Sequence, residues 1–251
     1  HMSPLALLTR PRPDSESLAA LLAAKGVDSL IDPIIDILPL DGAKLPPLEP
    51  VQAFLLTSAN GVRALAGLLG SARQAHAKPL LAVGAATAEA ARGAGFLHVE
   101  MAGGDVTSLA ALAKDRLDPA RGPLLHIAGT RIAGDLAGRL GADGFDVQRT
   151  CLYRAEASTA LAGKTRDALA GGKIDMVLFF SPRSAHGFVK LIRALAPDSL
   201  APITAICLSP AVAEVASGLT WLRIRTASQP AQAALLDEVA QEIEVAEQHG
   251  R

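Results

Sequence analysis

The feature that most constrains this chain is a short apolar run that recurs along it, each time followed by small polar turn residues and a helix-like stretch. The first run, residues 5–8, precedes a turn at 9–11, and the next segment predicts a helix capped by Asp14 and ended by Gly26. The same order follows the runs at residues 53–56, 80–83, 124–127, 176–180 and 204–206. This alternation predicts an α/β protein whose parallel sheets are covered by helices on both faces.

The chain also repeats itself weakly at a long spacing. A shift of 123 positions superimposes Ser58 on Ser181, Val83 on Ile206, Ala88 on Ala211 and Gly95 on Gly218. A shift of 118 positions superimposes Leu18, Leu22 and Gly26 on Leu136, Leu140 and Gly144. The shared order predicts two related halves of about 120 residues, and taken alone it would divide the chain once, near Arg121.

Length and charge exclude several classes of protein. With 251 residues the chain has room for one large α/β domain or two small ones. The 24 basic and 25 acidic side chains nearly cancel, which argues against a protein that coats nucleic acid. Cys151 and Cys207 have neither metal-ligand nor disulfide-framework spacing, so no metal site is expected.

Apolar runs and the first residues bear on where the protein works. No run approaches the roughly 18 to 20 residues that a membrane helix needs, and the N-terminal segment lacks the pattern of a secretion signal. His1, which precedes Met2, is interpreted as a cloning remnant and left out of the fold argument. We therefore expect a cytoplasmic protein without a membrane partner or a nucleic-acid partner.

Two stretches do not fit a compact strand–helix unit. Residues 27–40 and 145–156 are rich in β-forming side chains, and each follows a glycine that ends a predicted helix. We expect them to be paired connectors between domains. The tail, residues 231–247, predicts a final amphipathic helix.

The ends of the predicted strands carry small polar residues and glycines, a composition that suits anionic groups. Ligands of open parallel sheets gather at the carboxyl ends of the strands, where helix N-termini offer unpaired N–H groups. The residues at these ends are Thr9, Arg10, Ser58, Asn60, Gly84, Thr87, Gly129, Arg131, Ser181, Arg183 and Ser184. Each turn taken singly is better explained as an ordinary helix cap, and only their repetition near three arginines favours an anion-binding surface.

Other chemistries find little support in the sequence. It contains no GxxxxGK[ST], GxGxxG, HExxH or GxSxG motif, which argues against nucleotide hydrolysis, dinucleotide cofactors, zinc proteolysis and the hydrolase elbow. No cofactor is implied. The histidines at positions 76, 98, 126 and 186 are dispersed, and we expect structural roles for them.

Tyr153 is the only tyrosine, and it lies in the second connector beside Arg154. One interpretation is structural: a tyrosine at an interface buries its ring and hydrogen-bonds its hydroxyl. The other is chemical, since a phenol on a connector between domains can donate a proton to a ligand. The sequence leaves both open.

The same residues resemble the uroporphyrinogen-III synthase family. The likeness rests on the segments 8–11, 57–62, 83–88, 151–154 and 180–184, and it covers nearly the whole chain. In order they read Leu-Thr-Arg-Pro, Thr-Ser-Ala-Asn-Gly-Val, Val-Gly with a following Thr-Ala, Cys-Leu-Tyr-Arg and Phe-Ser-Pro-Arg-Ser. The chain departs from the family at residues 207–210 and at Ala128.

The resemblance implies a fold of two doubly wound parallel-sheet α/β domains joined by a two-stranded β linker. One domain is discontinuous, with residues 1–36 and 156–251, and the other comprises residues 37–155. The linker strands are expected near residues 30–40 and 147–156.

The resemblance also implies a reaction. Hydroxymethylbilane loses its terminal hydroxyl as water, and the azafulvenium that results attacks the substituted carbon of ring D. A spiro intermediate then fragments and recloses with ring D inverted. Positioning is expected to matter more than acid–base chemistry, because the enzyme must prevent the spontaneous closure that leaves ring D uninverted. Tyr153 is the expected proton donor, and the strand-end residues given above are the expected contacts of the substrate's eight carboxylates.

The expected protein is a monomer that takes hydroxymethylbilane, with the preceding pathway enzyme as a further candidate partner. Two other readings compete. The first is a two-domain binding module that closes on a small anionic ligand without chemistry. The second is a sugar or nucleotide enzyme that binds phosphate at Gly84 or Gly129.

Overall fold

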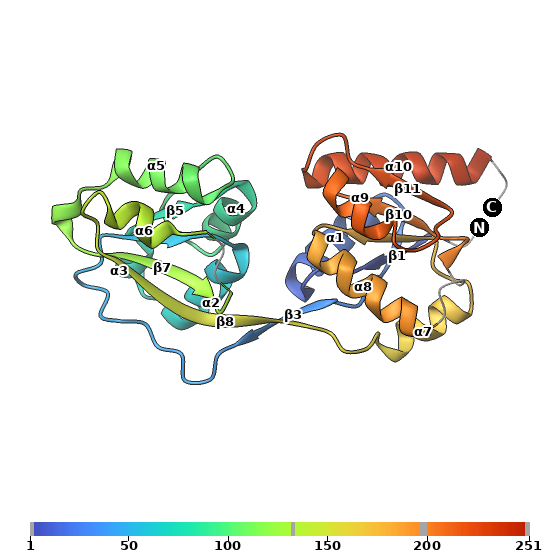
Figure 1. Ribbon diagram of the computed structural model, residues 1–251, viewed down its shortest axis with the longest axis horizontal. Coiled ribbons are helices and arrows are strands. Elements are labelled where there is room, and N and C mark those ends of the chain that lie inside the picture. Colours follow the sequence, from blue (N-terminus) through green and yellow to red (C-terminus); the bar gives the residue numbers. More distant parts are fainter. Residues whose placement is uncertain (1–2, 132–133, 196–199, 249–251) are drawn as a thin grey trace. The chain divides into compact units, whose positions relative to one another are not determined.

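The computed structural model describes residues 3–131, 134–195 and 200–248; His1 and Met2 lie outside them. Within it the chain forms two compact units. Unit 1 comprises His1–Asp36 and Glu156–Arg251, and unit 2 comprises Ile37–Ala155 (Figure 1). The fold class is confirmed, since both units are α/β with parallel sheets.

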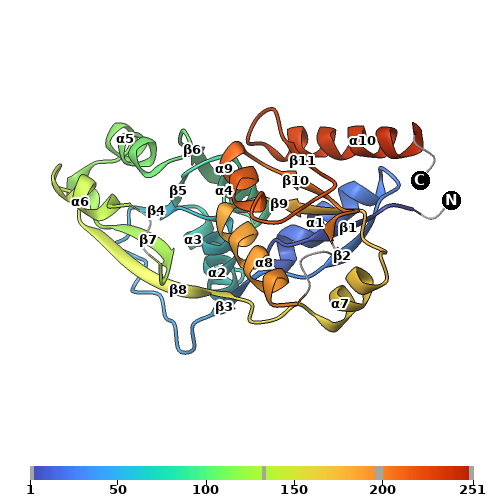
Figure 2. The same cartoon turned by 45° about the vertical axis from the view of Figure 1, so that its right-hand side comes forward.

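Unit 1 is built on a five-stranded sheet in the order β11-β10-β9-β1-β2. In chain order its elements are β1 (Leu5–Leu8), α1 (Arg12–Ala23), β2 (Asp28–Ile31), α7 (Gly163–Ala170), β9 (Met176–Phe179), α8 (Pro182–Leu195), β10 (Thr204–Cys207), α9 (Pro210–Ala216), β11 (Arg223–Thr226) and α10 (Gln232–Gln248). Each strand of this sheet pairs in parallel with its neighbours. One face is covered by α7, α8 and α9 and the other by α1 and α10, which explains why β1, β9 and β10 are almost wholly apolar (Figure 2).

Unit 2 is built on a six-stranded sheet in the order β3-β8-β7-β4-β5-β6. In chain order its elements are β3 (Ile35–Pro39), β4 (Ala53–Leu56), α2 (Ala59–Leu69), α3 (Arg73–His76), β5 (Pro79–Ala82), α4 (Ala85–Gly93), β6 (His98–Met101), α5 (Val106–Arg116), η1 (Pro119–Arg121), β7 (Leu124–Gly129), α6 (Leu136–Gly141) and β8 (Val147–Ala157). Helices α2, α3 and α4 pack on one face, and α5 and α6 pack on the other.

Five strands of the unit 2 sheet and the five strands of unit 1 follow the same spatial order, but the chain passes through the two sets in a different sequence. Unit 2 runs β8-β7-β4-β5-β6 across its sheet, and unit 1 runs β2-β1-β9-β10-β11. The shift of 123 therefore superimposes β4 on β9 and β5 on β10, while the shift of 118 superimposes β7 with α6 on β1 with α1. The repeat is real, but the first strand–helix–strand segment of the chain belongs with the last hundred residues. A single division near Arg121 is wrong for that reason.

The linker is an antiparallel ribbon of β3 and β8. The Ser158 amide donates to the Ile34 carbonyl at 2.8 Å, and the Leu40 amide donates to the Leu152 carbonyl at 3.0 Å. Both passages of the chain from one unit to the other occur in this ribbon. Strand β8 has a second role, because its first half is also a strand of the unit 2 sheet, paired in parallel with β7.

Three sequence-based expectations need correction. Residues 27–40 are not one connector, because β2 pairs in parallel with β1 at the edge of the sheet. The side chains of β2 are partly or fully exposed, so the strand does not form a continuous apolar run in the sequence. The outer strands β6 and β11 are polar at several positions and were missed for the same reason. Asp14 is not the cap of α1, which begins at Arg12, because a proline in the first turn, Pro13, has a backbone suited to the start of a helix.

No helix in the described part of the chain is long and apolar enough to cross a membrane.

Candidate active site

The carboxyl edge of the unit 2 sheet gathers three of the predicted site residues. Gly129 is the last residue of β7, Ser58 lies two residues after β4 as the N-cap of α2, and Tyr153 lies in β8. The three strands are neighbours in the order β8-β7-β4. Parallel pairing therefore brings together residues that lie up to 95 positions apart in sequence.

A hydrogen bond joins the two hydroxyl groups at this edge. Ser58 Oγ lies 2.7 Å from the Tyr153 hydroxyl oxygen, and either oxygen can be the donor. Ser58 Oγ also accepts a hydrogen bond from the Gly61 amide at 3.0 Å, which caps the first turn of α2. Tyr153 is half-buried, so its ring is held by packing while the residue keeps access to solvent.

Tyr153 reaches this position through an irregularity in the sheet. β7 and β8 pair residue by residue from Leu124 with Val147 as far as Ala128 with Cys151, and then Gly129 pairs with Tyr153. Leu152 is the extra residue of a β-bulge, and it is buried. Bulges re-aim the side chains that follow them and are common beside functional sites. Without the extra residue, the side chain opposite Gly129 would be Leu152.

Gly129 provides the space for the Tyr153 ring. A Cβ atom at residue 129 would lie 2.7 Å from Cε2 and 2.9 Å from Cζ of Tyr153, closer than such contacts occur in proteins. The Gly129 carbonyl accepts a hydrogen bond from Nη2 of Arg149 at 2.6 Å. Gly129 thus contacts both the Tyr153 ring and the Arg149 guanidinium. Any side chain at residue 129 would displace the ring.

Two further residues, His126 and Arg149, lie near this edge, and the sequence analysis singled out only the first. His126 in β7 is 8% exposed, and its Nε2 lies 3.4 Å from Oγ1 of Thr57. Burial, followed by the charge of Arg149, lowers the pKa of His126 to about 4, so the ring is neutral at pH 7. Its position within the apolar run 124–127 was the available signal of burial. Nothing local indicated the neighbouring arginine, which comes from β8.

The other predicted residues of unit 2 lie around this edge. Gly84 is the N-cap of α4, no side chain of the described residues caps that helix, and Thr87 in its first turn is buried. Asn60 in α2 accepts a hydrogen bond from Nη1 of Arg63 at 2.8 Å, while Arg131 is exposed after β7. The first turn of α4 thus begins at the carboxyl edge of β5 without a side-chain cap, and helix starts of this kind can bind an anion through their backbone amides.

The predicted residues of unit 1 are more fully occupied by their own unit. Thr9 is completely buried, and its hydroxyl donates to the Leu178 carbonyl at 2.8 Å. Arg10 lies over the Phe180 ring at 4.1 Å and donates to the Gln232 side chain at 3.1 Å. These bonds hold β1, β9 and α10 together, so both side chains have a structural role.

The strand end after β9 is similar. Ser181 Oγ accepts from the Ser184 amide and donates to Ser184 Oγ, both at 3.1 Å, in the first turn of α8. Ser184 is buried, and Arg183 is half-buried with interactions of its own. The three residues are brought together at the carboxyl edge of the unit 1 sheet, where hydrogen bonds within the helix already use the two serine hydroxyls.

Comparison with known families decides the assignment. The sequence model described as uroporphyrinogen-III synthase HemD matches residues 16–237, which is most of the chain. The chain belongs to the uroporphyrinogen-III synthase family. The resemblance drawn from the strand-end motifs is thereby confirmed. No curated protein sequence matches the chain.

Solved structures of this family share the fold. The uroporphyrinogen-III synthetase of Helicobacter pylori aligns with a TM-score of 0.61 at 18% identity, covering 96% of this chain and 99% of that one. A mutant uroporphyrinogen III synthase from Thermus thermophilus aligns with a TM-score of 0.50, also at 18% identity and with the same coverage. At this identity the likeness concerns the fold, including the two-unit α/β architecture.

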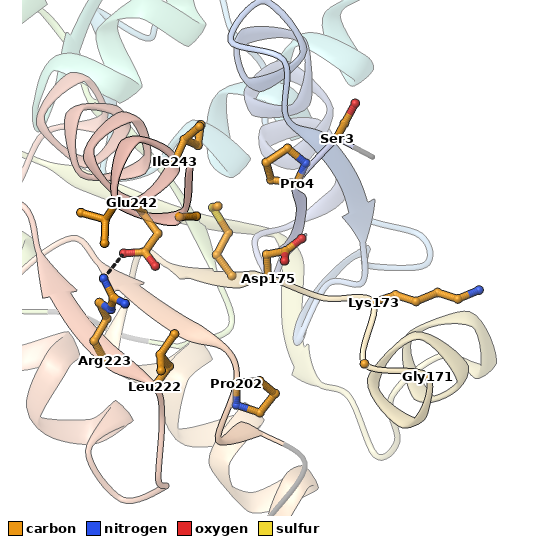
Figure 3. Close-up of a pocket in the computed structure, with 14 residues that line it drawn as sticks. Ser3, Pro4, Gly171, Lys173, Asp175, Pro202, Leu222, Arg223, Glu242 and Ile243 are labelled. Atoms are coloured by element: carbon orange, nitrogen blue, oxygen red, sulfur yellow. Dashed lines mark ion pairs between the residues drawn. The ribbon is translucent and has the colours of Figure 1, made fainter. Parts of the chain in front are cut away.

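One cavity of unit 1 lies away from the predicted site. Its volume is about 610 Å³, and its lining combines residues at or just before strand starts, including Pro4, Lys173, Asp175 and Arg223, with residues of α10 (Figure 3). This is the amino edge of the sheet, and none of the predicted site residues lines it. The buried Glu242 that lines it pairs with Arg225 at 2.6 Å, an ion pair that fastens α10 to β11.

Among residues 3–131, 134–195 and 200–248, no group of three or more His, Cys, Asp or Glu side chains could hold a metal ion.

Proposed function

We propose that this chain catalyses the closure of hydroxymethylbilane to uroporphyrinogen III, with loss of water and inversion of ring D. Membership of the uroporphyrinogen-III synthase family carries the proposal. The unit 2 edge supports it locally, because it combines one phenol, hydrogen-bonded at 2.7 Å to a capping serine, with the N-terminus of α4.

Tyr153 is the proton donor of this proposal. Its phenol protonates the terminal hydroxyl of hydroxymethylbilane as the bond from carbon to that oxygen breaks, so that water leaves and the azafulvenium forms. A proton lost from the macrocycle when the last ring closes regenerates the phenol. The reaction is therefore balanced without an external acid, and the effect of the donor is expected to be about 10²-fold or more.

Neutral donors are the proposed contacts of the carboxylates. The chain has a net charge of −1, so a general positive field cannot attract eight carboxylates. Backbone amides at strand ends and helix N-termini approach an anion closely and carry partial positive charge. In unit 2 these are the first turn of α4 at Gly84 and Thr87, with Asn60 and Arg131 beside them; in unit 1 they are the turns around Arg10 and Ser181–Ser184.

The binding-module alternative lacks comparable support. Polar strand ends alone would suit a sensor for a small anion, but the family match concerns a synthase and extends over both units. A phosphate enzyme would need the glycine-rich motifs that are absent from the sequence.

The assay that tests the function uses freshly generated hydroxymethylbilane. The protein is expected to yield the type III isomer, whereas the reaction without protein yields the type I isomer, and chromatography separates the two. Binding of the substrate without any shift from type I to type III would overturn the proposal in favour of the binding module.

We further propose that the protein works in the cytoplasm as a monomer, receiving its substrate from the enzyme that makes hydroxymethylbilane. The two well-separated thiols support a reducing compartment, since Cys207 is buried and no second cysteine lies near it in sequence. A sedimentation measurement with and without that enzyme tests the oligomeric state and the partnership together.

A further inference from the structure

We infer that Ser58 is a positioning residue for the Tyr153 hydroxyl, and that it acts on the reaction through this tyrosine instead of by holding a substrate carboxylate. The inference rests on the proposed function. It revises the expected role of Ser58, which the sequence analysis placed among the strand-end residues that contact the substrate's carboxylates. Four observations carry it: the hydrogen bond, helix α2 behind it, the contact of the ring with Gly129 and the matched position in unit 1.

The hydrogen-bonding capacity of Ser58 is limited. A hydroxyl has one proton to donate and two lone pairs to accept with. One lone pair already accepts from the Gly61 amide at 3.0 Å, and the remaining capacity faces the Tyr153 oxygen at 2.7 Å. Before the reaction the tyrosine can be either partner of this bond. After it has given its proton to the leaving hydroxyl, the phenolate oxygen can only accept, so Ser58 must then be the donor.

Helix α2 strengthens that donation. It has 11 residues, and its N-terminus is capped by the same oxygen, Ser58 Oγ. The Gly61 amide and the positive end of the helix dipole polarise the serine hydroxyl, which makes it a better donor to a negative oxygen. The charge that develops on Tyr153 is therefore stabilised through one bond by an oriented helix, an arrangement fixed before the substrate arrives.

Gly129 fixes the other side of the ring. Because a Cβ at residue 129 would lie 2.7 Å from the ring, the ring packs against β7 in space that only a glycine at residue 129 leaves open. The direction of the Tyr153 hydroxyl is thus set by a strand on one side and by Ser58 on the other. Removal of the serine hydroxyl leaves the ring in place but frees its oxygen.

Ser181 is the matched position in unit 1 and shows what the same residue does without a tyrosine. It follows β9 as Ser58 follows β4, at the repeat spacing of 123. Its Oγ accepts from the Ser184 amide, three residues on, and donates to Ser184 Oγ. In unit 1 the serine completes its bonds with Ser184 in the first turn of α8. In unit 2 residue 61 is a glycine, which offers no hydroxyl, and Ser58 Oγ shares its second hydrogen bond with the Tyr153 hydroxyl.

The test compares Ser58→Gly, Ser58→Thr and Asp135→Gly in the hydroxymethylbilane assay. Glycine removes the hydroxyl at little cost to the start of the helix, and threonine retains a hydroxyl. Asp135 caps α6 in the same unit through the Gly138 amide, so its glycine variant reports the loss of a cap alone. Ser58→Gly should lower kcat about tenfold with KM little changed, Ser58→Thr should recover most of it, and Asp135→Gly should keep the wild-type kcat.

A double variant makes the test decisive. If Ser58 acts through the Tyr153 hydroxyl, Ser58→Gly combined with Tyr153→Phe should be no more than about twofold slower than Tyr153→Phe alone. A rise in KM with kcat retained, or independent losses that multiply in the double variant, would overturn the inference and return Ser58 to carboxylate binding. Failure of the wild-type protein to form the type III isomer would instead overturn the proposed function, so the two failures are distinguishable.

Discussion

The carboxyl edges of the two sheets have the same strand order and place a capping serine at the same repeat position, yet they differ in what the neighbouring strand brings. In unit 2 the bulge in β8 puts Tyr153 opposite Gly129, within 2.7 Å of Ser58. In unit 1 the pairing of β1 with β2 has no such shift. Beyond the end of β1, the Ile34 amide donates a hydrogen bond to the Thr9 carbonyl, and the apolar side chain of Ile34 is only 1% exposed. One edge carries a hydrogen-bonded phenol, and the other carries a buried apolar side chain.

The difference shows that two sheets with the same strand order can present different side chains at their carboxyl edges. A regular ladder alternates its side chains between two covered faces, which favours burial. A single extra residue, Leu152, breaks that alternation and places the Tyr153 side chain opposite Gly129 at the edge of the sheet. The unit 1 edge keeps backbone amides and helix starts, which suit the binding of carboxylates but give no proton.

The largest expected effect comes from removing the hydroxyl that distinguishes the two edges. Tyr153→Phe should lower kcat by about 10²-fold without abolishing activity, since positioning of the ring ends remains. Steady-state kinetics with separation of type III from type I product measures it, and circular dichroism checks that the fold is retained. Undiminished turnover would leave the unit 2 edge with a structural tyrosine only.

The next effect concerns β7 of unit 2, which carries His126 where β1 of unit 1 carries only Leu and Ala. Because the folded pKa of His126 is about 4 and the unfolded value is about 6.5, the unfolded chain binds the extra proton between these values. Stability should fall as pH decreases from 6.5 to 4, by about 3 kcal/mol from this group.

Urea unfolding at several pH values, with His126→Gln as the comparison, measures that contribution. The variant should lose less stability than the wild type between pH 6.5 and pH 4, while carboxylates contribute equally to both proteins. Parallel pH profiles would mean that His126 is not held in its neutral form.

A smaller effect is expected from filling the space under the ring. Gly129→Ala should cost about 2 kcal/mol of stability and lower kcat, because its Cβ would lie 2.7 Å from the Tyr153 ring. Tyr153→Leu should relieve the clash, so that the double variant is more stable than the sum of the single ones predicts. Gly67→Ala is the control, since a Cβ there meets nothing within 4 Å and an alanine favours α2. Purely additive stabilities would show that the glycine does not shape the position of the ring.

The smallest effect tests the structural role of the unit 1 edge. Thr9→Val removes the hydroxyl that donates to the Leu178 carbonyl at 2.8 Å and should lower the free energy of unfolding by about 1 kcal/mol. Thermal and urea unfolding measure it. A rise in KM for hydroxymethylbilane would mean instead that this buried hydroxyl contributes to substrate binding.

The sequence by itself determined the class of fold and the positions of most inner strands, because a strand buried on both faces must be a continuous apolar run. It also determined the family, through short motifs at the strand ends, and singled out Tyr153 as the one phenol. Half-exposed outer strands such as β2 and β6 were harder to predict, since no continuous run marks them.

Only the tertiary structure decided what Tyr153 touches. The bulge at Leu152, the space at Gly129 and the hydrogen bond with Ser58 join residues of β8, β7 and the β4–α2 turn. Ser58 and Tyr153 lie 95 positions apart in the sequence. Sequence patterns report local periodicity, whereas these contacts depend on strand order and register. A one-residue change in register places a different side chain at the edge, which is why the chemistry of this site could not be assigned before the sheet was known.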